Sequence, residues 1–262
     1  MTAKATGRAN WTRPQTLAAL HIYFQLPFGQ LHARQPKIKQ LSEWIDRTPG
    51  SVALKLCNFA SLDPLIVASG RSGMGNVSAQ DRMIWKELQA DWDKVALEAI
   101  AEYERLANER GVIADLDLLE APFLEDGRTR SAIVQVRVDQ ARFRRSVLAG
   151  YNTTCCISHL KHEKLVVASH IIPWSEDVKN RLNPHNGLCL SALHDKAFEQ
   201  GLITITPDFR VCVSEKLKAY EDDEFIRATL LEFDGRLISM PNRFAPNAAF
   251  LAHHNRRFGF AP

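Results

Sequence analysis

Three polar side chains able to take part in hydrolysis occur in a fixed order between residues 165 and 205. The apolar run Leu165 to Ala168 predicts a short strand, and His170 follows at its end. Asn186 lies in a predicted Asn-Gly turn, and His194 lies in the helical run that comes after it. A histidine just past a buried strand is held in one orientation yet faces solvent, which suits a general base.

The other two side chains suit the remaining tasks of a hydrolytic site. An imidazole at His194 can aim at the same point as His170, where a divalent cation would stabilise charge that develops on a phosphate. The amide of Asn186 can either ligate that metal through its oxygen or brace the loop. A single histidine near a strand end is usually structural or simply exposed, so the hypothesis depends on the ordered set and its flanking residues.

The flanking residues resemble a known family. The runs ASHIIPW, NGLCLSALHDKAF and GLITI are similar to those of the HNH nucleases, whose ββα-metal finger cuts nucleic-acid phosphodiesters. They look like the branch found at the C-terminus of restriction-type endonucleases. The resemblance extends upstream over Val134 to Ser158. It implies that His170 is the general base, that His194 binds the metal, and that Asn186 positions the base loop or ligates the metal.

The sequence departs from many HNH sites at two positions. Ser169 stands where many members have an acid or a second histidine, and Phe198 stands where many have another histidine one turn after the helical one. The motif therefore supplies few metal ligands, and Asp195 or Glu199 are the nearest candidates to complete the set. Water and phosphate oxygens would fill the remainder around Mg²⁺ (or Mn²⁺), because Mg²⁺ keeps several of its waters.

Composition and charge place these residues in a soluble chain of two domains. The chain has 262 residues, 45% of them hydrophobic, with a net charge of +3, which permits nucleic-acid binding without requiring it. It contains no run of eighteen apolar residues, and its N-terminus lacks an apolar signal core, so we expect a cytoplasmic protein with no membrane partner. Five cysteines without paired C-x-x-C knuckles argue against a structural zinc, although Cys156 and His159 could form part of one.

The N-terminal part is predicted to be helical and to contain a helix-turn-helix. Apolar residues recur at helical spacing before and after the break Asp46 to Gly50, and a helix-turn-helix lays its second helix in the major groove of DNA. The residue types on the outward face of this corner suit base edges and phosphates. The candidate DNA-contacting residues are Arg47, Ser51, Lys55 and Asn58. The alternative is a corner of an ordinary helical bundle that does not touch DNA.

An arginine-rich run precedes the histidine motif. Between residues 128 and 145 there are six arginines against one acid, and Phe143 anchors a helix at the end of this run. We interpret the run as a clamp on the DNA backbone, although arginine runs are commonly just a solvated face. The candidate clamp residues are Arg137, Gln140, Arg142, Arg144 and Arg145.

The sequence therefore predicts an α+β protein with a helical DNA-recognition domain (1–111), a linker (112–127) and a ββα-metal HNH nuclease domain (128–262). We expect a metal-dependent endonuclease of the type II restriction kind that hydrolyses phosphodiesters in double-stranded DNA. Because one such site cuts one strand, a homodimer on a twofold-symmetric target is the economical arrangement. The alternatives are a DNA-binding regulator that has lost catalysis, and a nicking or modification-dependent nuclease.

Overall fold

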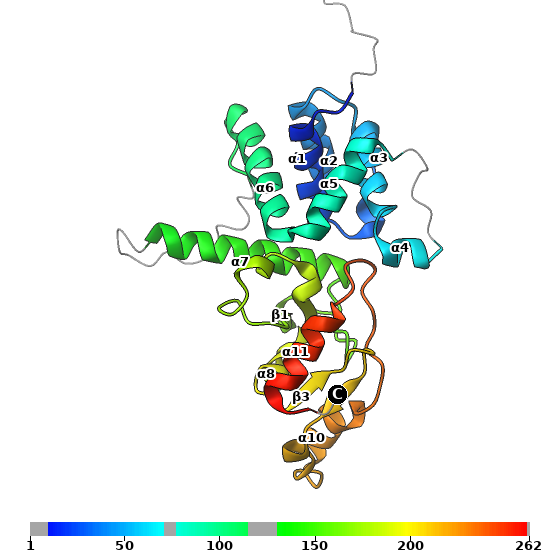
Figure 1. Ribbon diagram of the computed structural model, residues 1–262, viewed down its shortest axis with the longest axis vertical. Helices are drawn as coiled ribbons and strands as arrows, with labels where there is room; N and C mark the ends of the chain where they lie inside the picture. Colours follow the sequence, from blue (N-terminus) through cyan, green and yellow to red (C-terminus); the bar gives the residue numbers. More distant parts are fainter. Residues whose placement is uncertain (1–9, 71–76, 115–129, 261–262) are drawn as a thin grey trace, which may run out of the picture.

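A computed structural model describes residues 10–70, 77–114 and 130–260, and the side chains of residues 130–135 and 137 are not described. The chain forms a helical N-terminal group and a C-terminal group of helices and short strands, with the long helix α7 lying across the molecule between them (Figure 1). Each group surrounds its own hydrophobic core. No helix within the described ranges is both long and apolar enough to span a bilayer.

The N-terminal group consists of helices with well-defined starts. Its principal helices are α1 (Arg13–Gln25), α2 (Pro36–Trp44), α3 (Pro49–Ala60), α4 (Pro64–Ala68), α5 (Ala79–Ala90) and α6 (Trp92–Glu109). Prolines occupy the first turns of α1 to α4, where the missing N–H would have no helical partner anyway. Helix α1 is buried along nearly its whole length and packs against α3 and α6. It is therefore the central helix of this group.

The C-terminal group follows the order predicted around the histidines and adds elements to it. It contains α7 (Arg130–Gly150), β1 (Val166–His170), β2 (Gly187–Ser191), α8 (Ala192–Glu199), β3 (Ile203–Ile205), β4 (Val211–Val213), α9 (Glu215–Lys218), α10 (Glu224–Thr229) and α11 (Ala248–Phe258). Strands β1 and β2 pair antiparallel, with His170 opposite Gly187, and β3 pairs with β4 in a second small sheet. The apolar run Leu165 to Ala168 predicted β1, whereas β2 was missed because its five residues are all buried and show no alternation.

The two groups are joined by buried polar contacts. Arg243, from the segment before α11, is fully buried and donates hydrogen bonds to the carbonyls of Tyr23 and Phe24 near the end of α1, the latter at 3.0 Å. Leu182, from the loop between β1 and β2, and Phe244, from the segment before α11, belong to the N-terminal core. The predicted linker 112–127 lies mostly outside the described residues, and the proposed domain boundaries remain a prediction.

The predicted helix-turn-helix does not have the expected outward face. Helices α2 and α3 do meet at a short turn, but Lys55 and Asn58 are buried rather than exposed. Lys55 forms an ion pair of 2.6 Å with Asp81 on α5, and the Asn58 amide donates to the same carboxylate at 3.3 Å. The outward placement of these two residues was wrong because α3 is enclosed by α1, α2 and α5. Helix α3 is a core helix.

Candidate active site

The β1–β2 hairpin and α8 form the framework of the site. Ser191 at the end of β2 caps α8, because its hydroxyl accepts a hydrogen bond from the backbone N–H of His194. The hairpin loop, residues 171–186, includes two short turns of 3₁₀ helix, Val178–Asn180 and Pro184–Asn186. His170 ends β1 at the mouth of this loop.

The His170 imidazole is held from three sides. Its ring stacks on Phe143 of α7 with centroids 3.6 Å apart, and Trp174 lies edge-on at 5.5 Å. Its Nε2 is 3.0 Å from the carbonyl oxygen of Arg181. A carbonyl only accepts, so Nε2 must carry the hydrogen.

The chemistry of His170 follows from this tautomer. Burial lowers the pKa of His170 to about 4, despite the opposing effect of the Arg181 carbonyl. The ring is therefore neutral at pH 7, with its lone pair on Nδ1. No described residue donates to that nitrogen. His170 is thus a neutral imidazole of fixed orientation whose basic nitrogen is available.

Asn186 braces the loop that orients His170. Its side-chain oxygen accepts from the Ile172 N–H at 2.8 Å, and its amide nitrogen donates to the carbonyls of Ile172 at 3.0 Å and Asn180 at 3.3 Å. The residue is 1% exposed. Of the two roles considered for Asn186, the contacts support bracing and leave the amide poorly placed for a metal.

A carboxylate from the N-terminal group holds the same loop. Asp93 on α6 accepts hydrogen bonds from the backbone N–H groups of Arg181 at 3.0 Å and Leu182 at 3.1 Å. Burial raises the pKa of Asp93 to about 6, against the lowering effect of these hydrogen bonds. Since the carbonyl of Arg181 accepts from His170, Asp93 contacts the residue that fixes the orientation of the imidazole.

His194 does not have a nitrogen available for a metal. It is 3% exposed, its Nε2 donates to the Thr229 carbonyl at 3.0 Å, and its Nδ1 accepts from the Ser191 hydroxyl at 2.7 Å. Both ring nitrogens are engaged within the protein, and the role of His194 as a metal ligand stays a prediction. Ala197 and Phe198, three and four residues later, are also buried, so His194 lies on the core face of α8.

The next residue along α8 lies on a different face. Asp195 is half-buried, and Glu199, one turn later, is exposed. Burial and then the nearby Glu199 raise the pKa of Asp195, and the Ser169 hydroxyl lowers it. Ser169 is 3% exposed, and its hydroxyl has no full hydrogen bond to any described group. A carboxylate pair one turn apart, with the Ser169 hydroxyl beside Asp195, fits a hydrated Mg²⁺ ion, which needs only one or two carboxylate ligands.

The described residues contain no cluster of three His, Cys, Asp or Glu side chains arranged around one point. A metal at Asp195 and Glu199 would thus be coordinated largely by water and phosphate. The residues fit a metal at the carboxylate pair, whereas the side chains of His194 and Asn186 are engaged in hydrogen bonds within the protein.

The predicted arginine clamp is largely turned inward. Arg142 is buried and forms ion pairs with Glu104 and Asp139, and Arg144 donates to the carbonyls of Glu163 and Val166 at 2.8 Å each. Each guanidinium carries five donors in a rigid fork, which suits carboxylate and carbonyl acceptors of this kind.

The other predicted DNA-contacting residues differ in their exposure and in their contacts. Arg145 donates to the Gln25 side chain at 3.0 Å, and Arg47 donates to Gln15 at 3.1 Å and stacks over Trp11. Gln140 is exposed and Ser51 is half-buried. The side chain of Arg137 lies outside the described residues. The arginines therefore connect α7 and the α2–α3 turn to their neighbours, which a count of charges along the sequence could not reveal.

A family model described as HNH endonuclease matches residues 155–206. The matched segment contains β1, β2, α8 and β3, together with His170 and the loop that orients it. No curated protein matches the chain. The C-terminal part therefore contains an HNH nuclease domain, which acts on nucleic acid, and nucleases of this family are typically metal-dependent.

Three residues that shape the site were not assigned to it from the sequence. Phe143 was interpreted only as a helix anchor, the Arg181 carbonyl is a backbone group, and Asp93 lies seventy-seven positions before His170 in another domain. The one available signal was Asp93 itself, an acid that follows Trp92 on the buried side of a helix. Acids are rarely buried without a partner.

Proposed function

We propose that the protein is an endonuclease that hydrolyses DNA phosphodiesters with His170 as general base. Nδ1 of His170 takes a proton from a water molecule, and the resulting hydroxide attacks phosphorus. The bond from phosphorus to the 3′-oxygen breaks as the new bond forms, and the proton stays on His170 until it exchanges with solvent. The observation that carries this proposal is the neutral, oriented imidazole with its free Nδ1.

We propose further that Asp195, with Glu199, holds a Mg²⁺ or Mn²⁺ ion. When bound, such an ion would stabilise negative charge on the phosphate and the leaving oxygen. The support is the carboxylate pair at adjacent turns of α8 and the buried Ser169 hydroxyl beside Asp195. Asn186 would act on the base loop instead of on the metal.

The biological role that we propose is sequence-specific restriction in the cytoplasm. The helical residues 1–111 would select the DNA site, and residues 128–262 would cut it. A homodimer would place two single-strand cuts on a twofold-symmetric target, because each chain carries one His170. Among the predicted contacts whose side chains are described, Gln140 is exposed and remains an accessible candidate.

A second candidate function is a DNA-binding regulator with an HNH-type fold. Two observations favour it: His194 is occupied within the protein, and a serine stands at position 169. This alternative retains the fold and loses the metal.

One cleavage experiment separates the two functions. Unmodified and modified plasmid DNA would be incubated with Mg²⁺, Mn²⁺ or EDTA, with wild type beside His170→Ala and the matched control His162→Ala, an exposed histidine outside the site. We expect metal-dependent cutting by wild type and the control, and none by His170→Ala. If no variant cuts any plasmid but all of them shift DNA in a gel, the regulator is the correct function.

A further inference from the structure

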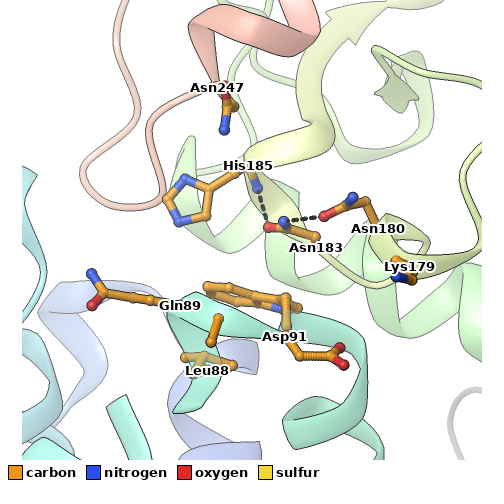
Figure 2. Close-up of a pocket in the computed structure, with 10 residues that line it drawn as sticks. Leu88, Gln89, Asp91, Lys179, Asn180, Asn183, His185 and Asn247 are labelled. Atoms are coloured by element: carbon orange, nitrogen blue, oxygen red, sulfur yellow. Dashed lines mark hydrogen bonds between the residues drawn. The ribbon is translucent and has the colours of Figure 1, made fainter. Parts of the chain in front are cut away.

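A cavity of about 420 Å³ opens where the N-terminal helices meet the hairpin loop of the nuclease domain. It lies at the α5–α6 junction, opposite the loop that holds His170. Figure 2 shows the side chains around it. On the loop side, the Asn183 amide donates to the side-chain oxygen of Asn180, and the backbone N–H of His185 donates to the side-chain oxygen of Asn183. A cavity of this size falls in the range that holds a small organic ligand.

The groups that line the cavity are mostly neutral and both donate and accept hydrogen bonds. Nδ1 of His185 donates to the Ala245 carbonyl at 2.6 Å, which leaves Nε2 as an acceptor. The side-chain oxygen of Asn247 accepts from the Ala249 N–H at 2.8 Å, which leaves its amide hydrogens to donate. Gln89 is exposed at the rim and offers both kinds of group.

The charge of the lining argues against a phosphate. Among the described residues that line the cavity, the only charged side chains are Asp91 and Lys179, one of each sign. Phosphate sites are rich in arginine or lysine. The indole of Trp92 meets the His185 ring edge-on at 5.2 Å and gives the cavity a flat aromatic wall. Neutral amides beside an aromatic wall are the groups that recognise the edge and face of a nucleobase.

The cavity shares a loop with the catalytic histidine. Asn180 and Asn183 line the cavity, and Arg181 between them accepts the hydrogen bond from His170. A ligand in the cavity would therefore lie one loop away from the attacking water.

We propose that this cavity binds one nucleobase of the DNA substrate, turned out of its stack near the scissile phosphate, and so selects the base at that position. The proposal rests on the proposed nuclease function, because the base belongs to the strand that His170 cuts. A free nucleotide offers the same chemistry, and the experiment distinguishes the two sources.

The first measurement is a binding titration with deoxynucleoside monophosphates, including 5-methyl-dCMP. NMR spectra of the full chain monitor the binding. The test variant is Gln89→Ala with Asn247→Asp, which keeps an oxygen to cap α11 and removes the donor. The control is Gln30→Ala, an exposed glutamine elsewhere. We expect at least one nucleotide to bind wild type, Gln30→Ala and His170→Ala alike, and about tenfold more weakly to the test variant, the usual effect of losing a base-edge contact. Deoxyribose 5-phosphate should not compete.

The second measurement is cleavage of a duplex library with randomised positions. Wild type and Gln30→Ala should prefer one base at one position close to the cut, and the test variant should lose that preference at least fivefold while it still cuts. Failure of every nucleotide to bind overturns the proposal. Binding of nucleotides without a change in library preference overturns it in favour of a free nucleotide. Cutting by His170→Ala would instead defeat the nuclease mechanism and leave the titration to decide the cavity.

Discussion

At the scale of single residues, the orientation of His170 depends on its neighbours more than on its position in the motif. Phe143 covers one face of the ring, and the Arg181 carbonyl fixes which nitrogen carries the hydrogen. Phe143 and the Arg181 carbonyl also shield the ring from water, and burial disfavours the charged form of an imidazole. The same arrangement that aims the base therefore keeps it neutral.

The first prediction concerns the protonation of His170. Because its folded-state pKa is about 4, its imidazole should remain neutral down to about pH 4, whereas a free imidazole is half-protonated at about pH 6.5. Folding stability from this group should then be lost as pH falls from about 6.5 to about 4, since only the unfolded chain takes up the proton there. Two-dimensional ¹H–¹⁵N spectra of the histidine side chains would report the titration, with His170→Ala used to assign the signal. A midpoint above pH 6 would contradict the prediction.

The second prediction concerns Asp93 as a positioning residue. Asp93→Asn is nearly isosteric. The carboxylate of Asp93 accepts from two backbone N–H groups, and the asparagine would face one of them with its own N–H donor. The loop should loosen, and kcat for cleavage should fall about tenfold, the effect of misplacing a base slightly, while KM changes little. Asp222→Asn, at an exposed acid outside the site, is the control. An equal loss in both variants, or a loss confined to KM, would show that Asp93 does not act through His170.

At the scale of elements, the contact between α7 and the β1–β2 hairpin controls the site. Gly187 of β2 lies against α7 so closely that an added Cβ would be 2.4 Å from Val147 Cγ2 and 2.9 Å from Phe143 Cζ. Phe143 is the ring on which His170 stacks. Crowding at Gly187 is thus transmitted to the catalytic imidazole.

The third prediction tests that contact. Gly187→Ala should destabilise the protein by roughly 1–3 kcal/mol through overpacking and should lower cleavage by displacing Phe143. Adding Val147→Ala removes the closest clashing methyl and should restore part of both the stability and the activity, although it opens space elsewhere. Urea unfolding and plasmid cleavage would be measured on the two single variants and the double variant. Strictly additive losses would mean that the two positions do not press on each other.

The fourth prediction concerns α3, whose polar residues support the core. Lys55→Ala would leave the fully buried Asp81 carboxylate without its cation, which costs about 3–5 kcal/mol. Ser51→Ala, on the same helix but half-buried, should change stability by less than about 0.5 kcal/mol. Urea unfolding would measure both. A small effect of Lys55→Ala on stability together with a large one on DNA affinity would restore the recognition role predicted from the sequence.

The sequence predicted the order of elements around His170 well and the direction of individual side chains poorly. Strand, loop and helix follow from an apolar run, an Asn-Gly turn and a helical pattern, which are local signals. His194 and Asp195 are neighbours on a helix, about 100° apart, and the motif alone did not decide between them. The burial of Ala197 and Phe198 shows that His194 lies on the core face of α8, because the three residues share that face.

Other features depended on contacts that no local pattern contains. Lys55 on α3 looks like a surface residue until Asp81 of α5 is placed beside it. The hydrogen bond from the Arg181 N–H to Asp93 joins the two groups of elements. Such pairs are set by how the helices pack, and a single sequence does not specify that packing.

At the scale of the whole molecule, the two groups of elements are coupled through polar contacts buried between them. Arg243 enters the N-terminal group and donates to the last carbonyls of α1, which otherwise have no helical partner. Asp63 accepts from the Phe244 N–H at 3.2 Å, and Asp93 accepts from the hairpin loop. The N-terminal and C-terminal groups should therefore unfold together.

The last prediction tests this coupling. Four of the five tryptophans, Trp11, Trp44, Trp85 and Trp92, lie in the N-terminal group, so their fluorescence reports mainly that group. The His170 ring signal reports the nuclease group. In wild type both signals should change at one urea concentration.

Arg243→Met keeps most of the side-chain volume but leaves two buried carbonyls unpaired, at about 1–3 kcal/mol each. The two transitions should therefore separate, and the nuclease group should unfold first as it loses its contact with Asp93. The exposed Arg256→Ala should leave a single transition. Coincident transitions in Arg243→Met would mean that the remaining contacts, the polar ones of Asp63 and Asp93 and the apolar ones of Leu182 and Phe244, are enough to couple the two groups.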